Sequence, residues 1–226
     1  MRRWILIPLT VGVVVTLAAG AAASAPPRVP TASTRALLAA GLITANDVPA
    51  AWTGSRQTND LKVFAGVPTC HALYLANVAA NRRVPNVLSR QFTDPASNGT
   101  TLASDQVFAF RTVAAASAFL AVLQRPNTAS CLTTVIQKVL ASSGVTDTTA
   151  AASPITTLGA LGDGRAGYEV TLAATIRGGS ISLVADFVVV RVGRVVVLPE
   201  FLNENRSLPE GPQIVTTVVN RVEAVG

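Results

Sequence analysis

The stretch Ala166–Leu202 reads AGYEVTLAATIRGGSISLVADFVVVRVGRVVVLPEFL and decides the fold class. It is rich in valine, isoleucine and threonine, which favour extended strands. Gly178-Gly179 and Gly193 interrupt it, and a two-residue Gly-Gly connection is typical of an antiparallel hairpin. The stretch therefore predicts a meander of three strands, Ala166–Arg177, Ser180–Val192 and Arg194–Leu202.

Further strands are predicted on the N-terminal side of this meander. One covers Pro154–Leu158. Val87–Thr93 alternates, and Thr100–Arg111 carries Gln106, Phe108 and Phe110 on one side and Val107 and Ala109 on the other. The turn-forming residues Asp94–Gly99 separate the two runs, so they predict a second hairpin. In the first of these two strands, the alternation places three side chains on one side, those of Leu88, Arg90 and Phe92.

Helices are predicted where apolar residues recur at a spacing of three and four. A helix from Pro68 to about Ala80 has Thr69 as its expected N-cap. The other helices cover Thr34–Ala40, Val113–Gln124, Thr128–Ser142 and the segment after Pro212. Together these elements predict an α+β domain in which helices cover a twisted antiparallel sheet of about six strands.

The N-terminus has the three parts of a secretory signal. Arg2 and Arg3 precede an apolar run from Trp4 to about Leu17, and small residues follow. Cleavage is expected after Ala23; the alternative is an uncleaved membrane anchor, because the run approaches the length of about 20 residues that spans a bilayer. The expected organisation is a signal peptide (1–23), a flexible lead-in (24–33) and a single domain (34–226), working outside the cytoplasmic membrane.

Cys70 and Cys131 are the only two cysteines of the chain. In an exported protein an even pair predicts a disulfide. A redox or nucleophilic thiol is the alternative, but the chain has no CxxC motif, and its single histidine, His71, is simply the sequence neighbour of Cys70.

The charge distribution argues against a nucleic-acid partner. Removal of the signal leaves 16 basic residues against 12 acidic ones, a net charge of +4. These basic residues are scattered along the chain, whereas a nucleic-acid surface gathers them on one face.

The residue types needed for catalysis, metal binding or cofactor binding are scarce. A single histidine provides neither a catalytic triad nor a metal cluster. Gly162-Asp163-Gly164 matches no phosphate-binding motif. Glu169, Asp186 and Glu200 lie on adjacent predicted strands, so a carboxylate pair stays open as the one route to hydrolysis. We expect a protein that is not an enzyme and that has no cofactor.

Asp186 interrupts a strand that is apolar on both sides. Leu183, Ala185, Phe187 and Val189 alternate with Val184, Val188, Val190 and Val192. Such a strand is normally covered on both faces, with Asp186 held by a hydrogen bond. The alternative is an open apolar trough containing Asp186, with Arg191 nearby, which would bind a lipid or a partner.

Several segments, spread over nearly all of the expected domain, form one combination. They begin with Leu37-Leu38 and with Ile43–Trp52, which reads ITANDVPAAW, and continue with a helix starting at Cys70. The others are Val107–Phe110, Ala114–Leu123 leading to Cys131, the Leu161-Gly162-Asp163 turn and a terminal helix. Together these segments resemble the PknH-like extracellular sensor domains of actinobacteria.

The resemblance implies a helix-decorated antiparallel sheet with a cleft for a ligand of the cell envelope. The chain departs from the pattern in lacking a kinase, a lipid-anchor cysteine and a second disulfide, and in having Ala51 where glycine is usual. The functional hypothesis is a non-enzymatic, ligand-binding or sensor-like domain of the bacterial cell envelope. It would bind a lipid or another small molecule through Asp186 and Arg191. The alternative is a structural or interaction protein that docks onto another envelope protein through its sheet face.

Overall fold

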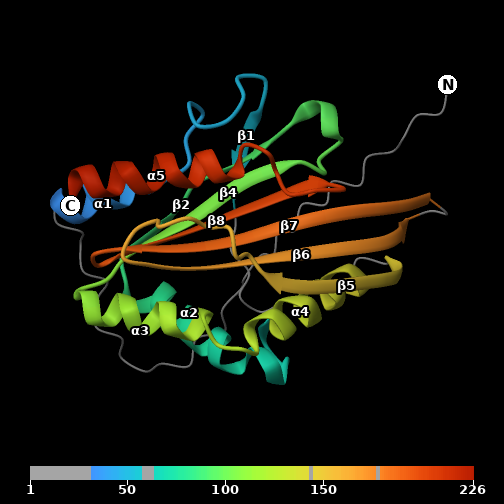
Figure 1. Cartoon of the computed structure of the whole chain (residues 1–226), viewed down its shortest axis with the longest axis horizontal. Coiled ribbons are helices and arrows are strands. Elements are labelled where there is room, and N and C mark those ends of the chain that lie inside the picture. Colours follow the sequence, from blue (N-terminus) through green and yellow to red (C-terminus); the bar gives the residue numbers. More distant parts are fainter. Residues whose placement is uncertain (1–31, 58–63, 143–144, 177–178) are drawn as a thin grey trace.

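The computed structural model describes residues 32–57, 64–142, 145–176 and 179–226, which form helices on both sides of one sheet (Figure 1). The expected signal peptide and most of the lead-in lie outside the described residues. The α-helices are α1 (Ala32–Ala40), α2 (His71–Arg83), α3 (Val113–Leu123), α4 (Thr128–Ser142) and α5 (Gly211–Val225), with short 3-10 helices η2 (Pro68–Cys70) and η3 (Pro95–Ser97). The strands are β1 (Thr53–Arg56), β2 (Asn86–Leu88), β3 (Arg90–Thr93), β4 (Leu102–Ala109), β5 (Thr146–Pro154), β6 (Gly164–Ile176), β7 (Gly179–Val192) and β8 (Val195–Glu204).

All strand pairs are antiparallel, which confirms the predicted α+β class. The sheet has eight strands rather than about six, in the order β1-β3-β4-β8-β7-β6-β5, and β2 also pairs with β4. The predicted meander is correct: β6, β7 and β8 are sequential neighbours. β8 then pairs with β4, so the two halves of the chain form one continuous sheet.

Helices cover both faces of the sheet, with α1 and α5 on one side and α2, α3 and α4 on the other (Figure 1). On the first side, Val188 and Val190 of β7 pack in one core with Val218 of α5. On the second side, Val189 of β7 packs with Phe119 of α3. The strand that is apolar on both faces is therefore covered on both, and no open trough lies along it.

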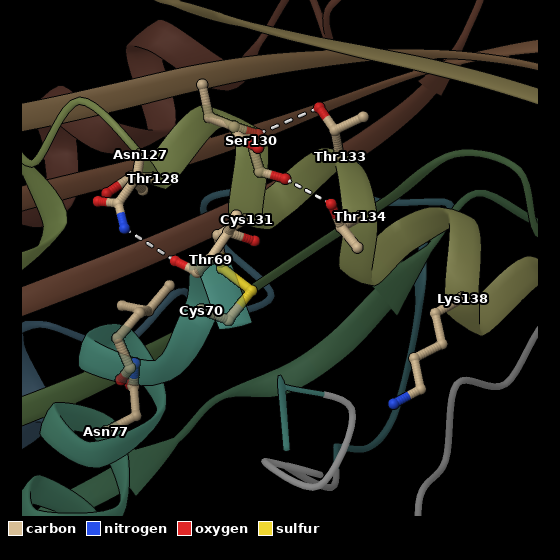
Figure 2. The surroundings of a disulfide bond; sticks show 12 residues. Thr69, Cys70, Asn77, Asn127, Thr128, Ser130, Cys131, Thr133, Thr134 and Lys138 are labelled. Carbon is tan, nitrogen blue, oxygen red and sulfur yellow. Dashed lines mark hydrogen bonds between the residues drawn. A yellow bond between two sulfur atoms is a disulfide. The ribbon is translucent and has the colours of Figure 1, made fainter. Parts of the chain in front are cut away.

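The predicted disulfide between Cys70 and Cys131 is confirmed (Figure 2). Both cysteines are completely buried, and their Cα atoms are 4.8 Å apart. The bond joins η2 to the first turn of α4, and Asn127 adds a side-chain hydrogen bond of 2.9 Å to the carbonyl oxygen of Thr69 beside it. The disulfide thus ties η2 covalently to α4 within the second helical layer.

Two of the predicted features differ in the structure, and one strand was missed. The predicted strand Pro154–Leu158 is displaced, because β5 begins at Thr146 and ends at Pro154, and it pairs with β6 over that range. Thr69 is not an N-cap, since its buried hydroxyl has no hydrogen-bond partner among the described residues. β1 was not predicted at all, because its four residues TGSR carry no hydrophobic pattern.

The predicted strand Val87–Thr93 is broken at Ser89 into β2 and β3. Leu88 pairs with Gln106, whereas Phe92 pairs with Ala103, so the broken strand has one residue more than β4 over the same span. This is the geometry of a β-bulge. Because Gln106 and Ala103 lie on opposite faces of β4, Leu88 and Phe92 do as well, and the prediction that they share a side was wrong.

Gly162 offers a sharp test of the turn before β6. Its φ of +55° suits glycine, and a Cβ there would also overlap the carbonyl oxygen of Arg191. Gly193 is a matched control, with a φ of +54° and no atom near its Cβ position. The left-handed conformation costs a non-glycine residue about 1–2 kcal/mol. In urea denaturation, we expect Gly193→Ala to lower the free energy of unfolding by about that amount. Gly162→Ala should lower it clearly more. Equal losses would show that the turn adjusts freely.

Candidate functional site

Asp186 is a buried part of a three-residue polar cluster. It is 6% exposed, and its Oδ1 lies 3.0 Å from Ser207 Oγ, which also lies 2.9 Å from Oε2 of Glu169. Burial raises the pKa of Asp186 against the opposing effect of the Ser207 hydrogen bond, and the charge of Glu169 adds to the rise. A hydroxyl has one proton to donate, so both contacts are hydrogen bonds when one carboxyl is protonated.

Two of the three carboxylates noted in the sequence therefore come together, and the third does not. Glu169 and Asp186 are register partners on β6 and β7. Glu200 pairs with Phe187, which places it on the opposite face of the sheet. A hydrolytic carboxylate pair must admit substrate and water, and Asp186 is enclosed. The arrangement fixes the Ser207 segment to β6 and β7.

Arg191 holds a turn together. Its guanidinium donates to Asp163 Oδ2 at 3.1 Å, to the carbonyl oxygen of Asp163 at 3.0 Å and to that of Gly193 at 3.0 Å. The Arg191 side chain is 12% exposed, while that of Asp163 is 54% exposed. Arg191 follows Asp186 by five positions on β7, an odd number, so their side chains point to opposite faces. The structure does not bring these two predicted ligand contacts together; ligand binding by either stays a prediction.

Asp105, which the sequence analysis overlooked, is the most deeply buried carboxylate of the described chain. It is 1% exposed, and its Oδ1 accepts a 3.1 Å hydrogen bond from the backbone N–H of Ile43. Its Oδ2 has no hydrogen-bond partner among the described residues. Burial raises the pKa of Asp105 to about 7. The sequence signal was an aspartate on the side of the strand that is otherwise apolar, with Ala103, Val107 and Ala109.

Arg221 of α5 fastens the same N-terminal segment from the other side. It makes a two-pronged ion pair with Asp47, at 2.8 and 3.0 Å, and donates to the carbonyl oxygens of Ala40 and Leu42. Burial acts to raise the pKa of Asp47, but hydrogen bonds from Arg221 and Thr44 outweigh it and lower the pKa. The segment from Ala40 to Val48 is thus clamped between α5 and β4.

An open cleft of about 450 Å³ lies at the sheet edge, where β1 ends beside the break between β2 and β3. It is lined by Arg56, Gln57, Leu88, Ser89 and Arg90. Both arginines are exposed and are register partners across β1 and β3. Its volume falls within the range of about 300–1,000 Å³ that is typical of small-molecule sites. The cleft is therefore the strongest candidate binding site of the described chain.

The bulge shapes this cleft. The backbone N–H of Ser89 donates to the carbonyl oxygen of Asp105 at 3.0 Å, and the N–H of Asp105 donates to Ser89 Oγ at 2.8 Å. With its amide nitrogen toward the strands, Gln57 donates to the carbonyl oxygens of Asp105 at 3.2 Å and Ser89 at 3.3 Å. Side chains thus satisfy the backbone where the strands are irregular, and the space beyond stays open.

Other candidate sites are weaker. An apolar cavity between α4 and the far ends of β6, β7 and β8 encloses about 30 Å³, room for one or two waters and not for a lipid chain. Within the described ranges, no group of three or more histidine, cysteine, aspartate or glutamate side chains is placed to hold a metal ion. Nor do those ranges contain a helix long and apolar enough to cross a bilayer.

Comparison with solved structures gives a distant likeness. No family model matches the chain, and no curated protein matches it. Among solved structures, the chain is similar to the crystal structure of the extracellular domain of PknH from Mycobacterium tuberculosis, with 16% sequence identity and a TM-score of 0.49. The similarity covers 86% of this chain and 98% of that one. A likeness this distant carries no functional argument, so function is considered below from the chain's own geometry.

Proposed function

We propose that the chain is an exported, non-enzymatic ligand-binding domain of the bacterial cell envelope, and that its ligand site is the cleft lined by Arg56, Gln57, Leu88, Ser89 and Arg90. The observation that carries the proposal is the cleft itself, which is open, of small-molecule size and lined by both polar and apolar side chains. Pockets of this kind are the usual binding sites of small ligands.

The location outside the cytoplasmic membrane rests on two features. The first is the signal-like N-terminus expected from the sequence. The second is the buried disulfide between Cys70 and Cys131, because structural disulfides form and persist in oxidising compartments. Attachment to a membrane would come only from the signal segment, if it stayed uncleaved.

A binding role suits the rest of the molecule better than catalysis. Asp105 and Asp186 are enclosed, and Arg221 and Arg191 are engaged in fastening the chain to itself. The alternative role, docking onto an envelope protein through a sheet face, would need an uncovered face. The part of that face formed by Val188 and Val190 is packed against α5.

The test is a small-molecule screen followed by backbone amide NMR of the purified protein. We expect ligands to shift the signals of residues 56, 57 and 88–90. Shifts centred on Asp163 and Arg191 would instead favour the site predicted from the sequence and would contradict the cleft. A broad screen in which no compound shifts the cleft amides would also contradict the proposal.

A further inference from the structure

The two arginines of the cleft are an unfavourable pair in the absence of an anion. Arg56 and Arg90 are direct register partners on neighbouring antiparallel strands. Like charges in this arrangement destabilise a sheet. Without a ligand, replacing either arginine by a neutral residue would therefore stabilise the sheet. Such a pair beside an open cavity points to a function in binding.

Gly54 leaves room for the Arg90 side chain along the sheet. A Cβ at Gly54 would lie 3.1 Å from Arg90 Nε and 3.2 Å from Arg90 Cδ, so the arginine runs directly across the glycine. Phe92 lies against the same position, at 3.1 Å. This contact restricts the long side chain before any ligand arrives, and a preordered side chain lowers the entropy cost of binding.

No counter-ion for the pair comes from the described part of the chain. The two ion pairs found there, Arg191 with Asp163 and Arg221 with Asp47, involve other arginines. Ser89 donates its hydroxyl to the Arg90 carbonyl oxygen at 2.9 Å, and Gln57 is engaged with backbone oxygens. The guanidinium groups of Arg56 and Arg90 are therefore the groups that a ligand would meet.

We propose that the cleft binds a phosphate-bearing ligand, with the phosphate group held between Arg56 and Arg90. A phosphate monoester carries close to two negative charges at neutral pH, which matches two guanidinium groups. Its oxygens also point in several directions, so two facing arginines each receive an acceptor, and guanidinium–phosphate pairs are frequently bidentate. The cavity exceeds the size of phosphate alone, and Leu88 gives it an apolar wall for the rest of the ligand. This inference rests on the proposed function and specifies its ligand class.

The test compares Arg56→Gln and Arg90→Gln with Arg165→Gln, which removes the same charge from an exposed position on β6. Calorimetric titration gives the affinities for inorganic phosphate and for glycerol 3-phosphate. A salt concentration of about 0.15 M screens non-specific attraction of the anion to the basic protein. Loss of a charge-assisted hydrogen bond should weaken binding roughly tenfold to a hundredfold in both cleft variants. Arg165→Gln should bind like the wild type. Thermal midpoints verify folding, and phosphate should raise the midpoint of the wild type more than that of either cleft variant.

Two sources share this chemistry, a soluble phosphate ester and a lipid headgroup. Vesicles containing phosphatidic acid, a phosphate monoester, are compared with phosphatidylcholine vesicles to distinguish them. Vesicle binding that depends on Arg56 assigns a lipid headgroup. Binding of glycerol 3-phosphate with no binding to the vesicles assigns a soluble ester. Equal weakening in Arg165→Gln, or phosphate binding that neither cleft variant alters, would overturn the inference. If the cleft amides respond to screened compounds while phosphate does not bind, the inference fails and the proposed function stands. If nothing perturbs the cleft, both fail.

Discussion

Replacing both Cys70 and Cys131 with alanine is expected to lower the free energy of unfolding by about 4 kcal/mol. The disulfide links residues 61 positions apart in the sequence. In the chain-entropy model, a cross-link of that span removes enough freedom from the unfolded chain to account for this value. Domains are typically stable by about 5–15 kcal/mol, so the bond would supply a large share of the total.

Urea denaturation of three samples measures this effect: the oxidised wild type, the wild type with reductant, and the double alanine variant. The reduced wild type should resemble the variant, since both lack the cross-link and differ only in two small buried side chains. A variant that matches the oxidised protein would show that η2 and α4 are held together without the bond.

The second large effect concerns the pH dependence of stability and the buried Asp105. Its pKa is about 7 in the folded protein, against 3.8 as the ordinary value. Between these values the folded state binds more protons than the unfolded state, so the contribution of Asp105 to stability falls as the pH rises. It is most favourable below about pH 4 and is lost by the time the pH passes 7. The difference corresponds to a free energy on the order of 4 kcal/mol.

Asp105→Asn should remove this dependence, because an amide does not titrate. The side-chain carbonyl oxygen of the asparagine can still accept the hydrogen bond from the Ile43 N–H. Its nitrogen takes the position of the unpartnered Oδ2, and a buried donor without a partner offsets part of the stability gained by removing the charge. We expect the variant to be about 2 kcal/mol more stable than the wild type at pH 8, with the order equal or reversed at pH 4.5.

Denaturation midpoints measured from pH 4.5 to pH 8 give the result. Taking the difference between variant and wild type cancels the titration of other groups, including Asp186, whose pKa is also raised, and Asp47, whose pKa is lowered. Asp105→Ala is the control, since it removes the charge together with the acceptor for Ile43. A constant difference between Asp105→Asn and the wild type over this range would mean that Asp105 stays ionised in the folded protein.

The sequence predicts those parts of the fold that have a strong local pattern. β6, β7 and β8 are long and separated by glycines, and β7 and β8 are rich in valine, so their positions and antiparallel pairing were evident. The stripe Ile214, Val215, Val218 and Val222 defines α5 in the same way. The cysteines paired without ambiguity because an exported chain with two of them has one pairing available.

The remaining features depend on contacts between distant segments. β1 becomes a strand because β3 offers it a backbone partner, and its own residues favour no conformation strongly. The bulge at Ser89 appears only when both neighbouring segments are aligned on β4. The cleft depends on both β1 and the bulge at Ser89. In the sequence, Arg56 and Arg90 are two separate arginines, and nothing there indicated that they form a binding site. Asp186 drew attention as a charge in an apolar strand, and Asp105 is the same kind of residue in a strand with a less regular pattern.

The contact between α1 and α5 has a mechanical consequence. α1 lies beside the C-terminal part of α5 (Figure 1), and Arg221 connects α5 to the carbonyl oxygens of Ala40 and Leu42. A pulling force applied between these two helices would therefore load this junction first, before it reached the strand ladder of the sheet. The Arg221–Asp47 ion pair would break at a lower force than the sheet. The sheet, and the elements η2 and α4 that the disulfide joins, would then stay folded.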